Sequence, residues 1–222
     1  MITPPVLRKG DQVAFIAPAR KVKFLELHKA SEILTSWGLE VVYPEGLFFE
    51  DNQFAGSDQS RIKHIQWCFE NPKIKAVFCV RGGYGTSRII DALDFSIFKN
   101  NPCWLIGFSD ITVLLNQLYN EGVKSIHGPV ALLLHQNENA QQQLKSILFA
   151  TNYLNVIEVR PHALNQTGRA VGQMIGGNLS VLVNQIGTSS FPALQNSILF
   201  LEDLDEYLYH IDRMMIQLDR IG

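Results

Sequence analysis

Residues 74–85 read IKAVFCVRGGYG, and residues 103–115 read CWLIGFSDITVLL. Each stretch opens with a nearly continuous apolar run, which is typical of a strand buried on both faces of a parallel sheet. The first run ends at a glycine-rich loop and the second at the sequence GFSD, and helical spacing follows each loop. The two stretches therefore predict successive βα units of one sheet.

The same alternation of strand and helix continues on both sides of these stretches. We expect further strands at 12–19, 39–44 and 124–130. We expect helices at 24–38, 57–72, 86–101, 109–122 and 141–150. Regular alternation predicts an α/β fold with a doubly wound, mainly parallel sheet flanked by helices. Ligands bind to such sheets beyond the carboxyl ends of the strands, so functional residues are expected in the loops that follow the strands.

The pattern changes near residue 150, where helical periodicity gives way to turns that contain glycine. We expect the α/β domain to cover residues 1–150 and a smaller, β-rich domain to cover residues 151–222. The last helical stretch is still amphipathic where the sequence stops. An open-ended helix would leave apolar surface uncovered, so the second domain is expected to be truncated.

Composition excludes several classes of protein. The net charge is −2 and the basic residues are scattered, which does not fit a nucleic-acid-binding protein. The sequence shows no signal peptide and no apolar run of about 18 residues, so no membrane association and a cytoplasmic location are expected. The three cysteines show no C-x-x-C spacing, so we expect buried thiols and no disulfide, metal or cofactor. Apolar surroundings disfavour Cys79 and Cys103 as nucleophiles.

Ser109 lies at the joint between a predicted strand and a predicted helix, where a sharp turn exposes the nucleophile of a G-x-S-x-G motif. Gly107 is present, but position 111 is isoleucine. A serine at the start of a helix is more commonly an N-cap whose oxygen accepts a backbone N–H, and the pattern alone favours that role. As a nucleophile, Ser109 would be favoured by the free amides and the dipole at a helix N-terminus.

The RGGYG loop would lie at the same edge of the sheet as Ser109. The backbone amides of Gly83 and Asp110 could then form an oxyanion hole between two adjacent loops. The same loop also fits a tight turn that needs positive φ, or a phosphate cradle at a helix beginning near Ser87. It matches neither G-x-G-x-x-G nor the Walker pattern, so phosphate binding is the weakest of these interpretations.

Arg81, Gly82 and Tyr84 of this loop are the candidate substrate-binding residues. The guanidinium of Arg81 would either hold a substrate carboxylate bidentately or form an ion pair with Asp91 or Asp94. The pattern favours neither role over the other.

Glu202 directly follows an apolar strand-like run, with further acidic residues at Asp203, Asp205 and Glu206. A carboxylate at this point could orient a histidine, as the third member of a catalytic triad does. The pattern alone favours a solvated acidic turn, and the spacing lacks the D-x-D-x-D-G pattern of a calcium loop.

Six histidines are available to complete a triad. His127, after a predicted strand, and His210, eight residues past Glu202, are the better placed of the six. Each is still more often structural than catalytic. Surface roles are expected for the other four, which are His28, His64, His135 and His162.

A set of sequence motifs in fixed order resembles the LD-carboxypeptidase family of serine peptidases, which includes murein tetrapeptide carboxypeptidases and microcin-immunity peptidases. The motifs are APA, FAGSDQSR, RGGYGTSRIID, GFSDIT, HGPV, GGNLS and LEDLDEYLYHIDRM. The combination of RGGYG, GFSD and HGP is far more specific than any one of them. The resemblance extends over essentially the whole chain.

The resemblance implies that Ser109 is the nucleophile, that Glu202 is the triad glutamate and that the amides of Gly83 and Asp110 form the oxyanion hole. It implies an enzyme that cuts the bond between a diamino acid and the terminal D-alanine of a murein tetrapeptide during cell-wall recycling. It also implies a homodimer. Lysine-type and diaminopimelate-type peptides are not distinguished by the sequence.

The sequence departs from the family at its end. The family histidine lies downstream of the DRM helix, and the chain ends at Gly222 before reaching it. We therefore expect none of the six histidines to be the catalytic base and expect the chain to be nearly inactive. A microcin-immunity-type hydrolase and a non-catalytic peptide-binding relative are the alternatives.

Overall fold

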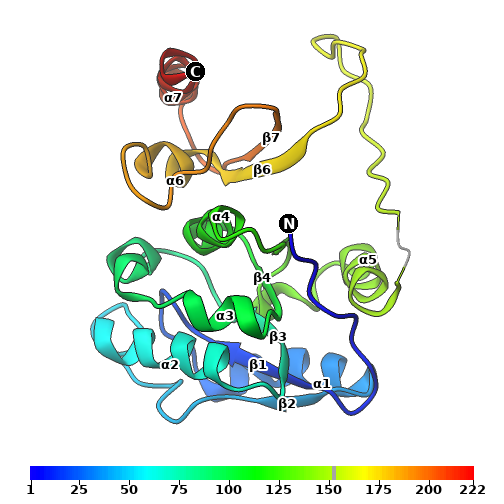
Figure 1. The fold of residues 1–222 in the computed structure, drawn as a ribbon, viewed down its shortest axis with the longest axis vertical. Helices are drawn as coiled ribbons and strands as arrows, with labels where there is room; N and C mark the ends of the chain where they lie inside the picture. The colour runs from blue at the N-terminus through cyan, green and yellow to red at the C-terminus, as the bar shows by residue number, and fades with distance from the viewer. Residues whose placement is uncertain (152–153) are drawn as a thin grey trace.

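The computed structural model describes residues 1–151 and 154–222. Its centre is a five-stranded sheet in the order β2-β1-β3-β4-β5, in which every neighbouring pair is parallel (Figure 1). The strands are β1 (Gln12–Ile16), β2 (Glu40–Val42), β3 (Ile74–Cys79), β4 (Trp104–Gly107) and β5 (Ile126–His127). The doubly wound parallel sheet predicted from the sequence is confirmed.

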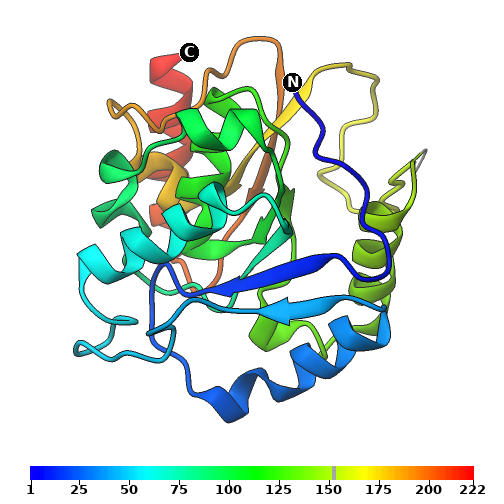
Figure 2. The same cartoon turned by 60° about the horizontal axis from the view of Figure 1, so that its bottom comes forward.

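Helices cover both faces of this sheet (Figure 2). One face packs against α1 (His28–Ser36) and α5 (Glu138–Phe149), and the other against α2 (Asp58–Glu70), α3 (Ser96–Asn100) and α4 (Thr112–Asn120). Alternate residues of each strand enter the two cores, because successive side chains of a strand point to opposite faces. Phe15 and Phe78 contribute to the first core, and Ile16 and Cys79 to the second.

The single helix predicted over residues 86–101 is wrong. The chain forms two short 3-10 turns, Thr86–Arg88 and Ile90–Ala92, before α3 begins. Just before α3, Oδ1 of Asp94 accepts hydrogen bonds from the backbone amide (2.9 Å) and the hydroxyl (2.6 Å) of Ser96. Local side-chain hydrogen bonds of this kind compete with a continuous helix.

The C-terminal region forms a second, smaller sheet. Its strands β6 (Gln173–Asn178) and β7 (Ser197–Glu202) pair in parallel, and α6 (Leu179–Asn184) and α7 (Leu208–Ile221) pack against each other through buried apolar residues. Residues 154–172 contain no helix or strand and are exposed. The expected small sheet in the second region is confirmed, while the boundary between residues 150 and 151 stays a prediction.

The second region lies on the side of the molecule where α4 is (Figure 1). Side chains along the length of α4 form hydrogen bonds with this region. The backbone amide of Asn178 donates to Thr112 Oγ1 (3.0 Å). Asn116 Nδ2 donates to Gln185 Oε1 (2.9 Å), and Asn120 Nδ2 donates to the Ser189 carbonyl (3.0 Å). In the part of the chain that the structure describes, no helix is both long and apolar enough to cross a membrane.

Candidate active site

Three loops meet at the carboxyl edge of the central sheet. Residues 17–23 follow β1, residues 80–85 follow β3 and residues 108–111 follow β4, and these three strands are neighbours. The glycine loop touches the serine directly, because a Cβ placed on Gly82 would lie 3.1 Å from Cβ of Ser109. The strand order reverses between β1 and β3, and sheets of this type bind ligands beyond such a reversal.

Ser109 occupies a strained backbone conformation. Its φ is +62°, in the left-handed region that non-glycine residues rarely adopt, at a cost of about 1–3 kcal/mol. The preceding Phe108 is extended, and a Cβ on Gly107 would lie 2.8 Å from Cγ2 of Ile111, so the turn is sharp and crowded. Ser109 is not the N-cap that the sequence pattern favoured, because no described side chain caps this helix start. This left-handed strand-to-helix turn resembles the strained turn that carries the nucleophile in a G-x-S-x-G motif.

Two backbone amides beside Ser109 are free to donate. Within residues 1–151 and 154–222, neither the Gly83 amide nor the Asp110 amide donates a hydrogen bond. Gly83 is exposed, and its φ is +112°, a value that favours glycine. The Asp110 carboxylate is buried and accepts hydrogen bonds from the Thr86 amide (2.9 Å) and hydroxyl (2.6 Å). This contact ties the serine turn to the glycine loop.

A fully buried arginine supports the glycine loop from beneath. Nη1 of Arg61 donates to the Pro18 and Gly85 carbonyls, and Nη2 pairs with Asp58. A Cβ on Gly85 would lie 2.6 Å from Nη1 of Arg61, so glycine is required there. Charge-assisted hydrogen bonds to two loops hold those loops in register. The sequence analysis did not identify Arg61 as a functional residue.

Arg81 and Tyr84 lie at the surface of the same edge. Arg81 is partly exposed and makes no ion pair with Asp91 or Asp94; Asp91 instead accepts a hydrogen bond from Ser189 (3.2 Å). The ion-pair interpretation of Arg81 is therefore wrong. Tyr84 is 47% exposed, and the centroid of its ring lies 5.9 Å from that of Phe54.

Glu202 lies on the second sheet and, among the described residues, is linked to the helix after Ser109 only through its neighbouring strand. It is the last residue of β7 and pairs in register with Asn178 of β6, whose amide hydrogen-bonds to Thr112, three residues after Ser109. One carboxylate oxygen of Glu202, Oε1, is buried with no hydrogen-bond partner among the described residues. Burial, and then the neighbouring charge of Asp203, raises the pKa of Glu202. Oε1 of Glu202 can therefore accept a hydrogen bond from a further donor.

Asp203 has a structural role that the sequence did not suggest. Its Oδ1 accepts a hydrogen bond from Nδ2 of Asn178 (3.0 Å), and its Oδ2 accepts one from the Ser180 amide (2.9 Å). It is therefore not part of a simply solvated acidic turn. Within the described chain, no cluster of three or more histidine, cysteine, aspartate or glutamate side chains could hold a metal ion.

None of the six histidines contacts the two candidate catalytic side chains by a hydrogen bond in the described structure. His127 lies between the rings of Phe108 (6.1 Å) and Phe200 (5.0 Å), and burial lowers its pKa. His210 pairs with Glu206 (2.7 Å) rather than with Glu202. The surface role expected for His64 is wrong, because His64 is buried and bonds to the Glu45 carbonyl (3.1 Å).

The three cysteines are buried free thiols, as expected. Burial raises the pKa of Cys103 to about 12 and that of Cys79 further. Thiols with such pKa values are not thiolates near neutral pH, so neither cysteine is a competing nucleophile.

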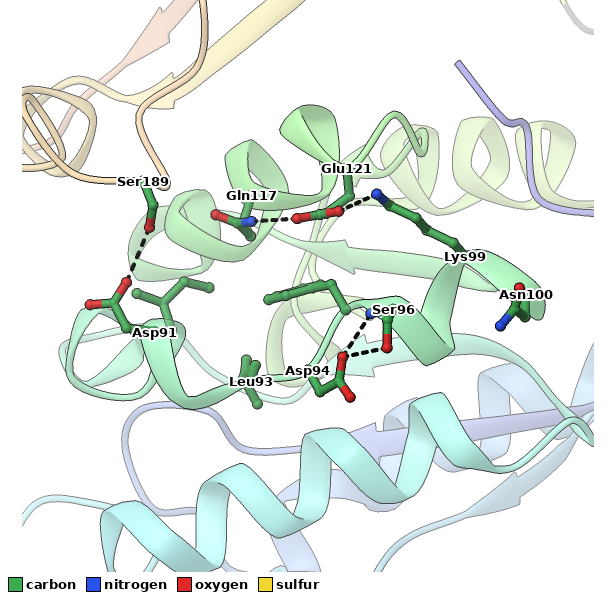
Figure 3. Close-up of a pocket in the computed structure, with 11 residues that line it drawn as sticks. Asp91, Leu93, Asp94, Ser96, Lys99, Asn100, Gln117, Glu121 and Ser189 are labelled. Carbon is green, nitrogen blue, oxygen red and sulfur yellow. Dashed lines mark hydrogen bonds and ion pairs between the residues drawn. The ribbon is translucent and has the colours of Figure 1, made fainter.

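Two pockets lie away from Ser109. Figure 3 shows one of about 500 Å³ beside α3 and α4, where Lys99 pairs with Glu121 (2.6 Å) and Ser189 bonds to Asp91. A second, more apolar groove of about 950 Å³ runs from Trp104 and His127 to Phe200. Ser109 and Glu202 line neither of these two pockets, and both residues are half-buried.

Comparison with known proteins identifies the family. The model of the LD-carboxypeptidase N-terminal domain matches residues 13–128, and that of the LD-carboxypeptidase C-terminal domain matches residues 171–222. The chain belongs to the LD-carboxypeptidase family. It is 34% identical over 224 residues to a probable murein peptide carboxypeptidase of Bacillus subtilis, covering 99% of this chain and 70% of the relative. It is 33% identical over 217 residues to the murein tetrapeptide carboxypeptidase of Pseudomonas aeruginosa, covering 93% and 71%.

Solved LD-carboxypeptidase-like structures share the fold. An MccF-like protein from Bacillus anthracis superposes with a TM-score of 0.88 at 27% identity, covering 99% of this chain and 76% of that one. A muramoyltetrapeptide carboxypeptidase from Oxalobacter formigenes gives a TM-score of 0.80 at 29% identity, covering 95% and 72%. The family resemblance inferred from the motifs is therefore confirmed.

Membership in the LD-carboxypeptidase family does not by itself test the residue assignments. The structure brings Ser109, Gly82, Gly83 and Asp110 together and places Glu202 on β7, whose neighbour β6 hydrogen-bonds to Thr112 at the start of α4. Their catalytic roles stay predictions, as do the substrate roles of the glycine loop. The supporting residues that the sequence analysis missed all lie in the motifs that carried the resemblance; they are Arg61, Thr86, Thr112 and Asn178.

Proposed function

We propose that the chain is a serine-type LD-carboxypeptidase that hydrolyses the bond to the terminal D-alanine of a murein tetrapeptide during cell-wall recycling. The observation that carries the proposal is the left-handed turn at Ser109, set between two amides that donate no other hydrogen bond within the described residues. The names of the relatives support a murein peptide as the substrate class.

In the proposed reaction, Oγ of Ser109 attacks the carbonyl carbon that precedes D-alanine. A base takes the hydroxyl proton and passes it to the amine of D-alanine as the C–N bond breaks. The amides of Gly83 and Asp110 donate hydrogen bonds to the oxygen that becomes negatively charged. Water, activated by the same base, then hydrolyses the acyl-enzyme and restores the Ser109 hydroxyl.

Glu202 would orient that base. Its buried Oε1, which accepts no hydrogen bond in the described structure, is suited to the ring N–H of a histidine. The six described histidines do not occupy this position, so we propose that the base is a different histidine. Residues 1–222 alone are then expected to release D-alanine several orders of magnitude more slowly than a protein with the complete triad.

The test follows D-alanine release from murein tetrapeptide by residues 1–222, by the product of the intact reading frame, and by the Ser109→Ala variant of that product. Only the wild-type product of the intact reading frame is expected to turn over. Ser36→Ala, in an exposed serine at the end of α1, serves as the matched control. Retention of activity by Ser109→Ala would reject the serine mechanism. A protein that binds the tetrapeptide without turning it over would instead be the peptide-binding relative.

The likeness to an MccF-like structure supports a second candidate, a microcin-immunity-type peptidase. The same assay with an aminoacyl nucleotide analogue as substrate separates the two. The second candidate would be favoured if the protein hydrolyses the nucleotide conjugate in a Ser109-dependent reaction and does not hydrolyse the tetrapeptide. The homodimer and the cytoplasmic location expected from the sequence also stay predictions; sedimentation and cell fractionation test them.

A further inference from the structure

Arg20 lies directly against the glycine loop. A Cβ placed on Gly83 would lie 2.2 Å from Cδ and 2.6 Å from Cγ of Arg20, so the side-chain stem of Arg20 covers the backbone of Gly83. Gly83 is one of the two proposed oxyanion donors. Arg20 therefore borders the place where the scissile carbonyl would bind.

The backbone fixes the position of Arg20. Arg20 forms an antiparallel bridge with Phe54, and the residues on either side extend it: the Ala55 amide donates to the Ala19 carbonyl (3.1 Å) and the Lys21 amide donates to the Gln53 carbonyl (3.1 Å). Because these backbone hydrogen bonds fix residue 20, the Arg20 side chain is positioned at the site without an ion pair to its guanidinium.

Arg81 lies in the glycine loop and Arg20, Arg61 and Arg88 lie beside it, and the charges of these four arginines are not equally compensated. Asp58 pairs with Arg61 and with Arg88 (2.9 Å). Within residues 1–151 and 154–222, no carboxylate forms an ion pair with Arg20 or with Arg81, and the Arg20 side chain is exposed. The sheet edge thus presents uncompensated positive charge beside Ser109.

We propose that Arg20 binds the terminal carboxylate of the substrate peptide. The inference rests on the proposed function, because a carboxypeptidase must recognise a negative charge one residue beyond the scissile carbonyl. With that carbonyl oxygen between the Gly83 and Asp110 amides, a guanidinium whose side-chain stem packs on Gly83 is placed to form a bidentate pair with the carboxylate. Arg20 is then a specificity-determining residue.

The order of the strands gives the direction of the bound peptide. Ser109 follows β4, the glycine loop follows β3 and Arg20 follows β1, in that spatial order along the sheet. The leaving D-alanine therefore lies towards β1, at the reversal of strand order where ligands bind to such sheets. The rest of the peptide extends towards β5 and the second sheet.

The test measures binding without turnover. In the Ser109→Ala product of the intact reading frame, calorimetry compares a tetrapeptide that ends in a D-alanine carboxylate with the same peptide ending in an amide. The starting protein is expected to prefer the carboxylate. Arg20→Met is expected to weaken carboxylate binding roughly 10- to 100-fold and to leave amide binding unchanged, while Arg20→Lys recovers part of the loss.

Arg8→Met is the matched control, because Arg8 precedes β1 at the opposite edge of the sheet, and it should keep the full preference. If Arg20→Met still binds the carboxylate peptide more tightly than the amide peptide, the inference is overturned. If Arg81→Met loses that preference instead, Arg81 binds the carboxylate. A starting protein that binds both peptides equally well also overturns the inference. D-alanine release is measured separately with Ser109 present, so its absence counts against the proposed function alone.

Discussion

The central sheet and the C-terminal region are stabilised in different ways. The sheet buries apolar side chains on both faces, and Phe78 and Leu105 within it are fully buried. The region 171–222 has a small apolar cluster around Leu182 and Met214, and it is held to α4 by hydrogen bonds that the α4 side chains donate or accept. The serine turn and the proposed oxyanion amides thus lie on the large core, whereas the position of Glu202 depends on the polar contacts of the smaller region. Ser109 and Glu202, two members of the proposed triad, are therefore held in place by different kinds of contact.

The largest expected effect comes from a cavity in the central sheet. Phe78→Ala removes a fully buried ring from β3, the strand between β1 and β4, and should lower the free energy of unfolding by about 3–5 kcal/mol. Urea denaturation followed by circular dichroism measures the change. Leu25→Ala is the control, because Leu25 is 80% exposed, and it should change stability by less than about 0.5 kcal/mol. A similar loss for both variants would contradict the assigned core.

A cavity in the C-terminal cluster should act more locally. Leu182→Ala removes a fully buried side chain from α6, at a cost of about 2–5 kcal/mol to that region. Amide hydrogen exchange should then show lost protection in β6, α6 and α7, while β1 and β3 keep theirs. If protection falls equally in all these elements, the two regions unfold as one unit and the contrast between them is wrong.

The smallest effect concerns His127, whose ring lies between Phe108 of the first region and Phe200 of the second. Burial lowers the pKa of His127 below its ordinary value of 6.5, so the unfolded chain binds the proton more readily than the folded chain. The free energy of unfolding therefore keeps its full value above pH 6.5 and decreases as the pH falls through the folded pKa of His127. The total decrease is about 1.4 kcal/mol for each pH unit by which the folded pKa lies below the unfolded pKa.

His127→Phe keeps a ring at this junction and should reduce the loss of stability on acidification. Thermal unfolding at several pH values between 4 and 8 checks this. Burial also lowers the pKa of His64, so part of the acid sensitivity should persist in the variant. His28→Phe, in an exposed histidine, should match the wild-type pH profile. An unchanged profile in His127→Phe would show that the junction does not titrate.

Local sequence patterns determined much of the fold. The apolar runs at 74–80 and 103–108 need burial on both faces, which a helix-flanked parallel sheet provides, and the strands β3 and β4 formed there. The stretch at 86–101 shows where a pattern fails, because its period is helical but the chain forms two 3-10 turns before α3. The Thr86 amide there donates to the Asp110 carboxylate, a contact between residues 24 apart that no local period predicts.

By itself the sequence determined the family, the parallel sheet and the loops that would carry function, because these depend on residue order and on periodic burial along the chain. Only the tertiary structure decided that Ser109 is a left-handed turn and not an N-cap, and that Arg61 and Arg20 stand beneath and beside the glycine loop. The physical reason is distance along the chain: Arg20 and Gly83 are 63 residues apart and meet only because β1 and β3 are hydrogen-bonded neighbours.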